Sequence, residues 1–165
     1  MLQMKDKRSK YPKRTRLKDF SYKGCYRYFI TLRSRNQASC FIDPGLVTKL
    51  SGILKETAEH RNFYVWVYCF MPDHLHLLVE GKTKDADMRG FIFTFKQKTS
   101  FWFSRVYQTR LWQPSYYERI LRKDEAVSAV ARYILENPVR KGIVTDYTLY
   151  PHSGSLEVND ISQII

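Results

Sequence analysis

The sequence predicts an α+β fold in which one antiparallel sheet packs against helices, and three observations support this prediction. Four short segments carry the alternating or continuous apolar pattern of strands, and three longer ones repeat apolar residues at helical spacing. These segments follow one another as strand, helix, strand, strand, helix, strand and helix. The chain has 165 residues, of which 44% are hydrophobic, so its length suits one domain with its own core.

The first half of the chain supplies three predicted strands and one helix. Residues 26–33 (YRYFITLR) alternate between an apolar set and a second set of side chains, which is typical of a strand. A helix is predicted over residues 44–59, because Pro44 suits the first helical position. Residues 63–70 form an apolar and aromatic run that predicts a buried strand, and residues 74–80 (HLHLLVE) predict its hairpin partner.

The second half of the chain completes the pattern. Residues 88–107 place their apolar side chains along one helical stripe, and residues 116–122 predict a fourth strand. Asp124 suits the cap of a last helix that runs to Asn137, where Pro138 stops it. A β-α-β-β-α-β order is that of a ferredoxin-like antiparallel sheet with helices on one face, so the last helix is an addition to it.

The chain is strongly basic, with 28 Lys and Arg residues against 16 Asp and Glu residues and a formal net charge of +12. Such a charge indicates a polyanionic partner, most often nucleic acid, and an aromatic share of 15% suits stacking with single strands. Residues 1–20 form a basic arm with Arg14 and Arg16, which is either a solvated tail or a phosphate-binding segment. We expect one domain over residues 21–144 and a loosely attached tail over residues 145–165.

Cysteine usage and hydropathy bear on the compartment. The three cysteines, at positions 25, 40 and 69, are odd in number and widely spaced, so they predict neither a disulfide framework nor a zinc knuckle. We therefore expect a reducing cytoplasm. No apolar run reaches the roughly 18 residues of a membrane helix and no signal peptide pattern opens the sequence, so we expect no membrane partner.

The first group of residues with chemical potential is His74-Leu75-His76. Side chains two positions apart on a strand share a face, so both imidazoles project together while Leu75 points into the core. Paired imidazoles supply half of a metal site for a borderline or first-row cation. The alternative is a pair of histidines that form hydrogen bonds and do nothing more.

The second group is Tyr133 with Asn137 on the last predicted helix. Residues four apart lie on one side of a helix, and the small residues Ala126 and Ala129 lie below Tyr133 on that side. A phenol and an amide oxygen above small neighbours can face one site. The alternative is a boundary tyrosine followed by an ordinary asparagine near a helix end.

Together the two groups suit phosphodiester cleavage. The Tyr133 hydroxyl can attack a scissile phosphate and form a covalent phosphotyrosine. Its ordinary pKa is about 10, so it needs activation at neutral pH. A divalent metal held by His74, His76 and the Asn137 oxygen would stabilise the developing charge.

Four segments of the chain resemble the HUH single-tyrosine transposases, in particular the REP-associated branch. HUH denotes two histidines around a bulky hydrophobic residue, as in His74-Leu75-His76. The matching segments are MPDHLHLLVEG (71–81), FKQKTS (95–100), LWQPSYYERILR (111–122) and YILENPVRKG (133–142). They occur in the order that the family has, and the resemblance as a whole extends over about residues 26–144.

The resemblance implies a function and a set of site residues. Tyr133 resembles the nucleophile, His74 and His76 the metal ligands, and Asn137 the ligand one turn beyond the tyrosine, where related transposases often have Gln. The family cuts and rejoins single-stranded DNA beside hairpins through a 5′-phosphotyrosine, with Mg²⁺ or Mn²⁺. For this chain it implies single-stranded or hairpin DNA as partner, a monomer or homodimer, and a cytoplasmic location at the bacterial nucleoid.

Basic residues near the proposed site are candidate DNA contacts. They flank the apolar stripe of the predicted helix over residues 88–107 or follow the last predicted helix: Lys96, Lys98, Arg105, Arg140 and Lys141. Two rival nucleophiles, Tyr116 and Tyr117, lie at a predicted strand start without an amide one helical turn away. We therefore favour Tyr133.

Two other functions fit parts of the sequence. A non-catalytic protein that binds single-stranded or hairpin nucleic acid would share the charge and the fold, but it gives no reason for His74, His76, Tyr133 and Asn137 to converge. A zinc nucleobase deaminase needs an H-x-E motif and a later P-C-x-x-C motif, and the sequence has neither.

Overall fold

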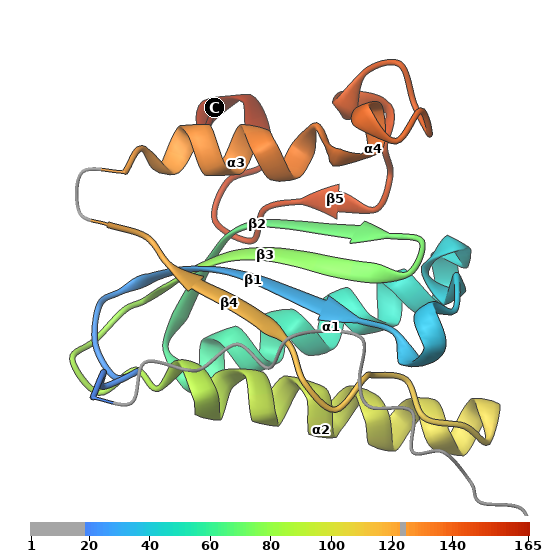
Figure 1. The fold of residues 1–165 in the computed structure, drawn as a ribbon, viewed down its shortest axis with the longest axis horizontal. Coiled ribbons are helices and arrows are strands. Elements are labelled where there is room, and N and C mark those ends of the chain that lie inside the picture. Colours follow the sequence, from blue (N-terminus) through green and yellow to red (C-terminus); the bar gives the residue numbers. More distant parts are fainter. Residues whose placement is uncertain (1–18, 123–124) are drawn as a thin grey trace, which may run out of the picture.

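A five-stranded antiparallel sheet forms the centre of the molecule (Figure 1). The computed structural model describes residues 19–122 and 125–165, so Arg14, Arg16 and most of the predicted basic arm lie outside the described residues. The strand order is β4-β1-β3-β2-β5. The strands are β1 (Arg27–Arg33), β2 (Phe63–Met71), β3 (His74–Gly81), β4 (Tyr117–Ile120) and β5 (Ser153–Gly154).

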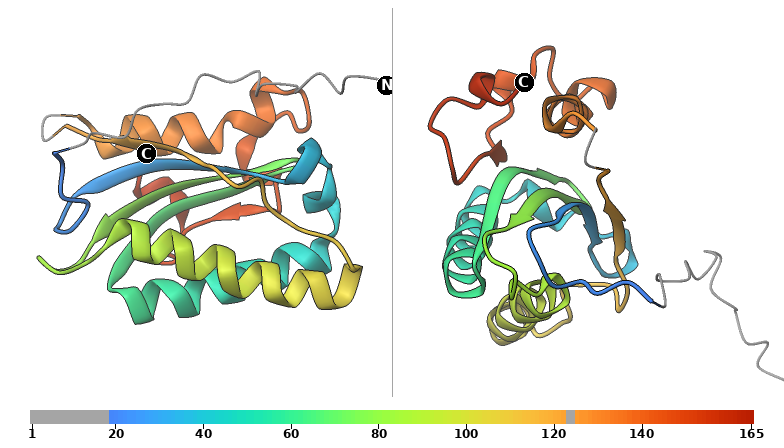
Figure 2. Two further views of the ribbon diagram at one scale, coloured as in Figure 1. Left: turned by 60° about the horizontal axis from the view of Figure 1, so that its bottom comes forward. Right: turned by 90° about the vertical axis from the view of Figure 1, so that its left-hand side faces the viewer.

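Helices cover both faces of the sheet. Helices α1 (Pro44–Arg61) and α2 (Met88–Tyr107) lie on one face, and α3 (Val127–Leu135) and the short α4 (Asn137–Arg140) lie on the other (Figures 1 and 2). Single 3₁₀ turns occur at η1 (Arg35–Gln37), η2 (Cys40–Ile42), η3 (Tyr147–Leu149) and η4 (Ile161–Gln163). In the part of the chain that the structure describes, no helix has the length and apolar character needed to cross a membrane.

The first four strands and the first two helices confirm the predicted ferredoxin-like arrangement. Asp43 caps α1 by accepting a hydrogen bond from the Gly45 amide at 2.9 Å, and Pro44 occupies the first helical position. The Asp87 side chain caps α2 in the same way through the Arg89 amide. These caps fix the first residue of each helix after the loop that follows the preceding strand.

Alternation along the strands divides the buried residues into two clusters. Leu75, Leu77 and Val79 of β3 belong to the large cluster under α1 and α2. Leu78 belongs to the second cluster, with Ile134 of α3. His74 and His76 have the same parity as Leu78, so the structure confirms that both imidazoles project from one face of the sheet, on the side of α3.

The last predicted helix is interrupted, contrary to expectation. Helix α3 ends at Leu135, and α4 begins at Asn137 with Pro138 in its first turn. Proline has no N–H and its ring clashes with the carbonyl group four residues earlier, so one continuous helix cannot form there. The helix also starts later than predicted, at Val127, and its expected cap Asp124 lies outside the described residues.

The expectation of a loosely attached C-terminal tail is wrong. Strand β5 pairs with β2, and Tyr150 is buried with its hydroxyl group donating to the Phe70 carbonyl at 2.6 Å. Ile161, Ile164 and Ile165 pack against the second cluster. The apolar residues of this segment pack through separate single contacts and do not recur at a helical or strand spacing. Sequence periodicity therefore does not reveal that the segment is packed on the sheet.

Replacing Tyr150 by Phe should destabilise the protein by about 1 to 3 kcal/mol, because a buried carbonyl group loses its partner. Urea unfolding of wild type and variant measures the difference. Tyr147→Phe is the matched control, since Tyr147 lies in the same segment and is only half-buried. Equal stability of Tyr150→Phe and wild type would show that this segment does not hold the sheet edge.

Candidate active site

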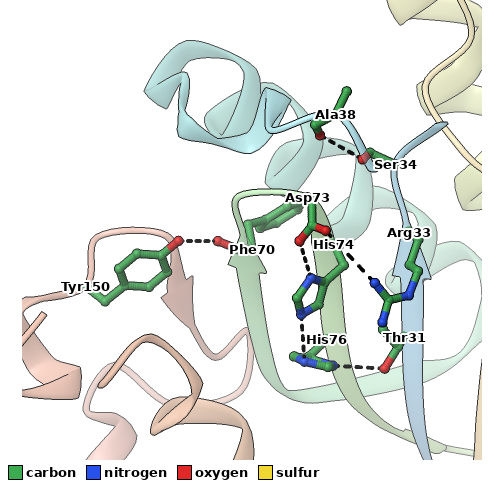
Figure 3. A network of polar contacts seen from close by, with 9 residues as sticks. All are labelled: Thr31, Arg33, Ser34, Ala38, Phe70, Asp73, His74, His76 and Tyr150. Carbon is green, nitrogen blue, oxygen red and sulfur yellow. Dashed lines mark hydrogen bonds and ion pairs between the residues drawn. The ribbon is translucent and has the colours of Figure 1, made fainter. Parts of the chain in front are cut away.

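The two histidines lie at the start of the central strand β3, side by side on its α3 face (Figure 3). In the sheet register His74 lies opposite Arg33 of β1, and His76 lies opposite Thr31. The Nε2 atoms of His74 and His76 are 3.1 Å apart, and the ring centroids are 4.6 Å apart. The structure therefore brings the predicted pair together with the same ring nitrogen of each facing the other.

The other nitrogen of each ring is held by a neighbour. His74 Nδ1 lies 2.5 Å from Asp73 Oδ1, and His76 Nδ1 lies 2.9 Å from Thr31 Oγ1 (Figure 3). Arg33 Nη1 is 4.0 Å from the second oxygen of Asp73. Ligand histidines in metal sites are oriented in this way, through the ring nitrogen that does not bind the metal.

Burial keeps the pair neutral. Burial, reinforced by the adjacent His74 ring and by the positive charges of Arg33 and Arg140, lowers the pKa of His76 to about 3. Burial also lowers the pKa of His74, although the Asp73 carboxylate acts in the opposite direction. Both rings are therefore uncharged near neutral pH, which is the form that binds a cation.

Tyr133 faces the same part of the sheet from helix α3. Its ring meets Phe29 of β1 edge to face, with centroids 6.0 Å apart, and Phe29 also stacks on the His76 ring at a centroid distance of 5.4 Å. Tyr133 is 52% exposed, so its hydroxyl group is accessible to a large substrate. Phe29 thus connects the predicted nucleophile to the histidine pair within one chain.

Asn137 is buried beside Tyr133. Its Nδ2 atom donates to the Tyr133 carbonyl at 3.1 Å, which leaves the Oδ1 atom as the acceptor of the side chain. In the described ranges no set of three His, Cys, Asp or Glu side chains surrounds a possible cation position. The donor set therefore fits a divalent metal if an amide oxygen and substrate oxygens complete the two imidazoles.

Two of the predicted DNA contacts lie beside this site. The Arg140 guanidinium lies over the Tyr133 ring at 4.3 Å and donates to the Tyr133 carbonyl at 2.6 Å. Arg140 and Lys141 are also among the charges that act on His76 and His74, respectively. Both cations can therefore meet a phosphate that approaches Tyr133.

The other three predicted contacts lie elsewhere. Lys96, Lys98 and Arg105 belong to α2, on the opposite face of the sheet (Figure 2), so the expectation that they lie beside the proposed site is wrong, and their contact with DNA stays a prediction. Lys96 donates to the carbonyl groups of Gln113 and Pro114 at 2.7 and 3.0 Å. Helical position alone could not show which face of the sheet α2 covers.

Sequence reasoning missed the residues that support the pair. Thr31, Arg33 and Phe29 lie on the face of β1 that carries the second cluster, and Asp73 occupies the turn before His74. The alternation of β1 placed three of them on one face, but only the register with β3 shows that they meet the histidines. Of the rival tyrosines, Tyr116 packs against the core under α1 and α2, whereas Tyr117 shares the face of the histidines, 5.9 Å from Phe29.

The site thus combines a histidine pair on the central strand β3 with a tyrosine on helix α3, on one face of the sheet. The chain belongs to the family described as "Transposase IS200 like", whose model matches residues 22–137. This family membership identifies a transposase-type protein.

Individual relatives agree with this assignment. A protein of Haemophilus influenzae with the provisional name REP-associated tyrosine transposase is 28% identical over 147 residues, which cover 82% of each chain. The solved structure of a REP-associated tyrosine transposase bound to a REP hairpin has a TM-score of 0.70 at 21% identity, covering 84% of this chain and 81% of that one. The solved structure of a provisionally named transposase of Deinococcus radiodurans has a TM-score of 0.51 at 21% identity, and the match covers 74% of this chain and 96% of that one.

Proposed function

We propose that this protein cuts and rejoins single-stranded DNA beside a hairpin through a covalent 5′-phosphotyrosine at Tyr133. The observation that carries the proposal is the placement of Tyr133 and the His74–His76 pair on one sheet face, with Phe29 between them. The REP hairpin bound to a protein of the same fold supports hairpin DNA as the substrate. Since one chain supplies all of these groups, we propose that a single protomer is sufficient for cutting.

The reaction has two balanced halves. The Tyr133 oxygen attacks the scissile phosphorus and forms a P–O bond as its proton leaves, while the bond from phosphorus to the sugar 3′-oxygen breaks and that oxygen takes up a proton. In the reverse half a 3′-hydroxyl attacks the phosphotyrosine and releases Tyr133. Rejoining needs no ATP, because the phosphotyrosine retains the bond energy.

The groups around Tyr133 divide the remaining work. Mg²⁺ or Mn²⁺, when held by His74, His76 and the Asn137 oxygen, would supply positive charge to the scissile phosphate. Arg140, which lies over the Tyr133 ring, brings a guanidinium to the phosphate that is being transferred. Asp73 and Thr31 keep the imidazoles in one orientation throughout.

Formation of a covalent adduct tests this proposal. The full chain is incubated with single-stranded oligonucleotides that carry a hairpin, in the presence of Mn²⁺ or Mg²⁺, and then denatured in detergent. We expect a DNA-linked protein band that disappears with a chelator and returns when metal is restored. Binding of the hairpin without any adduct would favour the non-catalytic nucleic-acid-binding function instead.

Binding should weaken steeply as salt is added, because phosphates are the main contacts of a chain with a net charge of +12. For single strands the slope of log affinity against log salt is about −0.7 per neutralised phosphate, so we expect a slope of about −3 or steeper. Fluorescence anisotropy with a labelled hairpin oligonucleotide measures it. A nearly flat dependence would contradict recognition through phosphates.

A further inference from the structure

A cavity of about 380 Å³ opens beside Tyr133, between helix α3 and the edge strand β4. Its volume lies at the lower end of the range of about 300–1,000 Å³ for small-molecule sites. Tyr133 itself forms part of the wall, so whatever fills the cavity lies next to the proposed nucleophile. The proposed reaction gives this cavity no role.

Three aromatic rings line the cavity. Phe29 lies between Tyr133 and Tyr117, at centroid distances of 6.0 and 5.9 Å and interplanar angles of 89° and 68°. Proteins that bind single strands use such rings as platforms on which unpaired bases stack. The walls therefore suit a flat, largely apolar ligand.

The polar groups of the cavity form a matched pair. Arg119 Nη1 lies 2.7 Å from Glu125 Oε1, and both residues line the cavity. Each side chain keeps further donors or acceptors that this contact does not use. One positive and one negative charge favour a neutral ligand with hydrogen-bonding edges, whereas Arg140 and Lys141, which would bind phosphate, lie towards the histidines.

A small residue keeps the cavity open. Ala129 lines it from α3, one helical turn before Tyr133, and is exposed. A longer side chain at this position would project into the space in front of Phe29. The cavity is therefore open because the side chain of Ala129 is only a methyl group, which is exposed and not part of the hydrophobic core.

We propose that this cavity accepts the base of the nucleotide whose 5′-phosphate becomes linked to Tyr133, so that Arg119 and Glu125 select which base follows the cut. This inference rests on the proposed function and assigns a specificity site to it. The linked nucleotide is the candidate occupant because it stays attached to Tyr133, whose ring is a wall of the cavity, while the strand with the free 3′-hydroxyl can leave. The aromatic walls would stack the base and the ion pair would read its edge.

Sequencing of captured strands tests the inference directly. Hairpin oligonucleotides with a randomised single-stranded flank are incubated with the full chain and Mn²⁺, and the DNA linked to protein is recovered and sequenced from its 5′ end. The first base is then the one next to the phosphotyrosine. We expect wild type to favour one base or one class of base about fivefold or more, as a good hydrogen-bonded base contact allows.

Ala129→Leu should reduce that preference to less than about twofold, because the leucine fills the space that the base requires. Leucine is a good helix former, so α3 is retained. Ser128→Leu is the matched control, since it adds the same side chain at an exposed neighbouring position that does not line the cavity. It should keep the wild-type preference.

The outcomes separate this inference from the proposed function. A random first base in the wild-type adducts would overturn the base site, and so would an Ala129→Leu variant with the same base preference as wild type. Neither result would contradict the cutting reaction. Absence of adducts from wild type with every strand would instead overturn the cutting reaction and the base site with it. If Ala129→Leu fails to fold by circular dichroism, Glu125→Gln decides: it preserves the cavity volume and should change the favoured base, and an unchanged base contradicts the inference.

Discussion

Tyr133→Phe should abolish covalent attachment of DNA and leave hairpin binding nearly unchanged. The substitution removes only the hydroxyl oxygen that would form the bond to phosphorus. The ring remains, so its edge-to-face contact with Phe29 and its stacking with Arg140 persist. Denaturing gels measure the adduct and anisotropy measures the affinity, for which we expect a change of less than about threefold, or 0.7 kcal/mol.

Tyr117→Phe is the appropriate control for this experiment. Tyr117 lies on the same sheet face as the histidines and also contacts Phe29, so it is the rival tyrosine placed nearest to the proposed site. We expect Tyr117→Phe to form adducts. An adduct that survives in Tyr133→Phe and disappears in Tyr117→Phe would move the nucleophile to β4.

His76→Ala has the second largest expected effect, a loss of DNA cutting of at least about 100-fold. The substitution removes one of two imidazoles that face each other at 3.1 Å, and a single remaining histidine cannot hold a divalent cation as two do. Titration of Mn²⁺ by calorimetry should show the corresponding loss of affinity. Hairpin binding should persist, because the cations that meet phosphate are retained.

His60→Ala controls for general effects of removing a histidine. His60 is exposed near the end of α1, on the other face of the sheet. It should cut at the wild-type rate. Wild-type cutting and Mn²⁺ affinity in His76→Ala would show that the histidine pair has no part in the reaction.

Much of the fold follows from the sequence because its signals are local. Period-two and helical patterns, together with Pro44 at the first helical position, predict β1 to β3 and the first two helices to within two residues at each end. The break between α3 and α4 was harder to predict, since Pro138 was expected to end a helix after Asn137 rather than before it. The packing of Tyr150 and β5 could not be predicted from the sequence, because it depends on single contacts between residues that are distant in the chain.

The candidate site divides in the same way. His74 and His76 are two apart on one strand, so their common face could be predicted from the chain alone. The proximity of Tyr133 to the two histidines depends on how α3 crosses the sheet. From the sequence, this proximity could be predicted only through the resemblance to a family. That Thr31 and Arg33 lie beside the histidines could be known only from the register between β1 and β3. Lys96 was predicted at the wrong place because the sequence does not show which face of the sheet α2 covers.

Mass spectrometry of the trapped adduct tests the central claim most directly. After capture on a hairpin oligonucleotide, the protein is digested with trypsin and the nucleotide-bearing fragment is identified. We expect residues 133–140, or 124–140 where the adduct blocks cleavage after Arg132, and each of these fragments contains one tyrosine. A nucleotide on residues 111–119 instead, which contain Tyr116 and Tyr117, would contradict the assignment of the nucleophile to Tyr133.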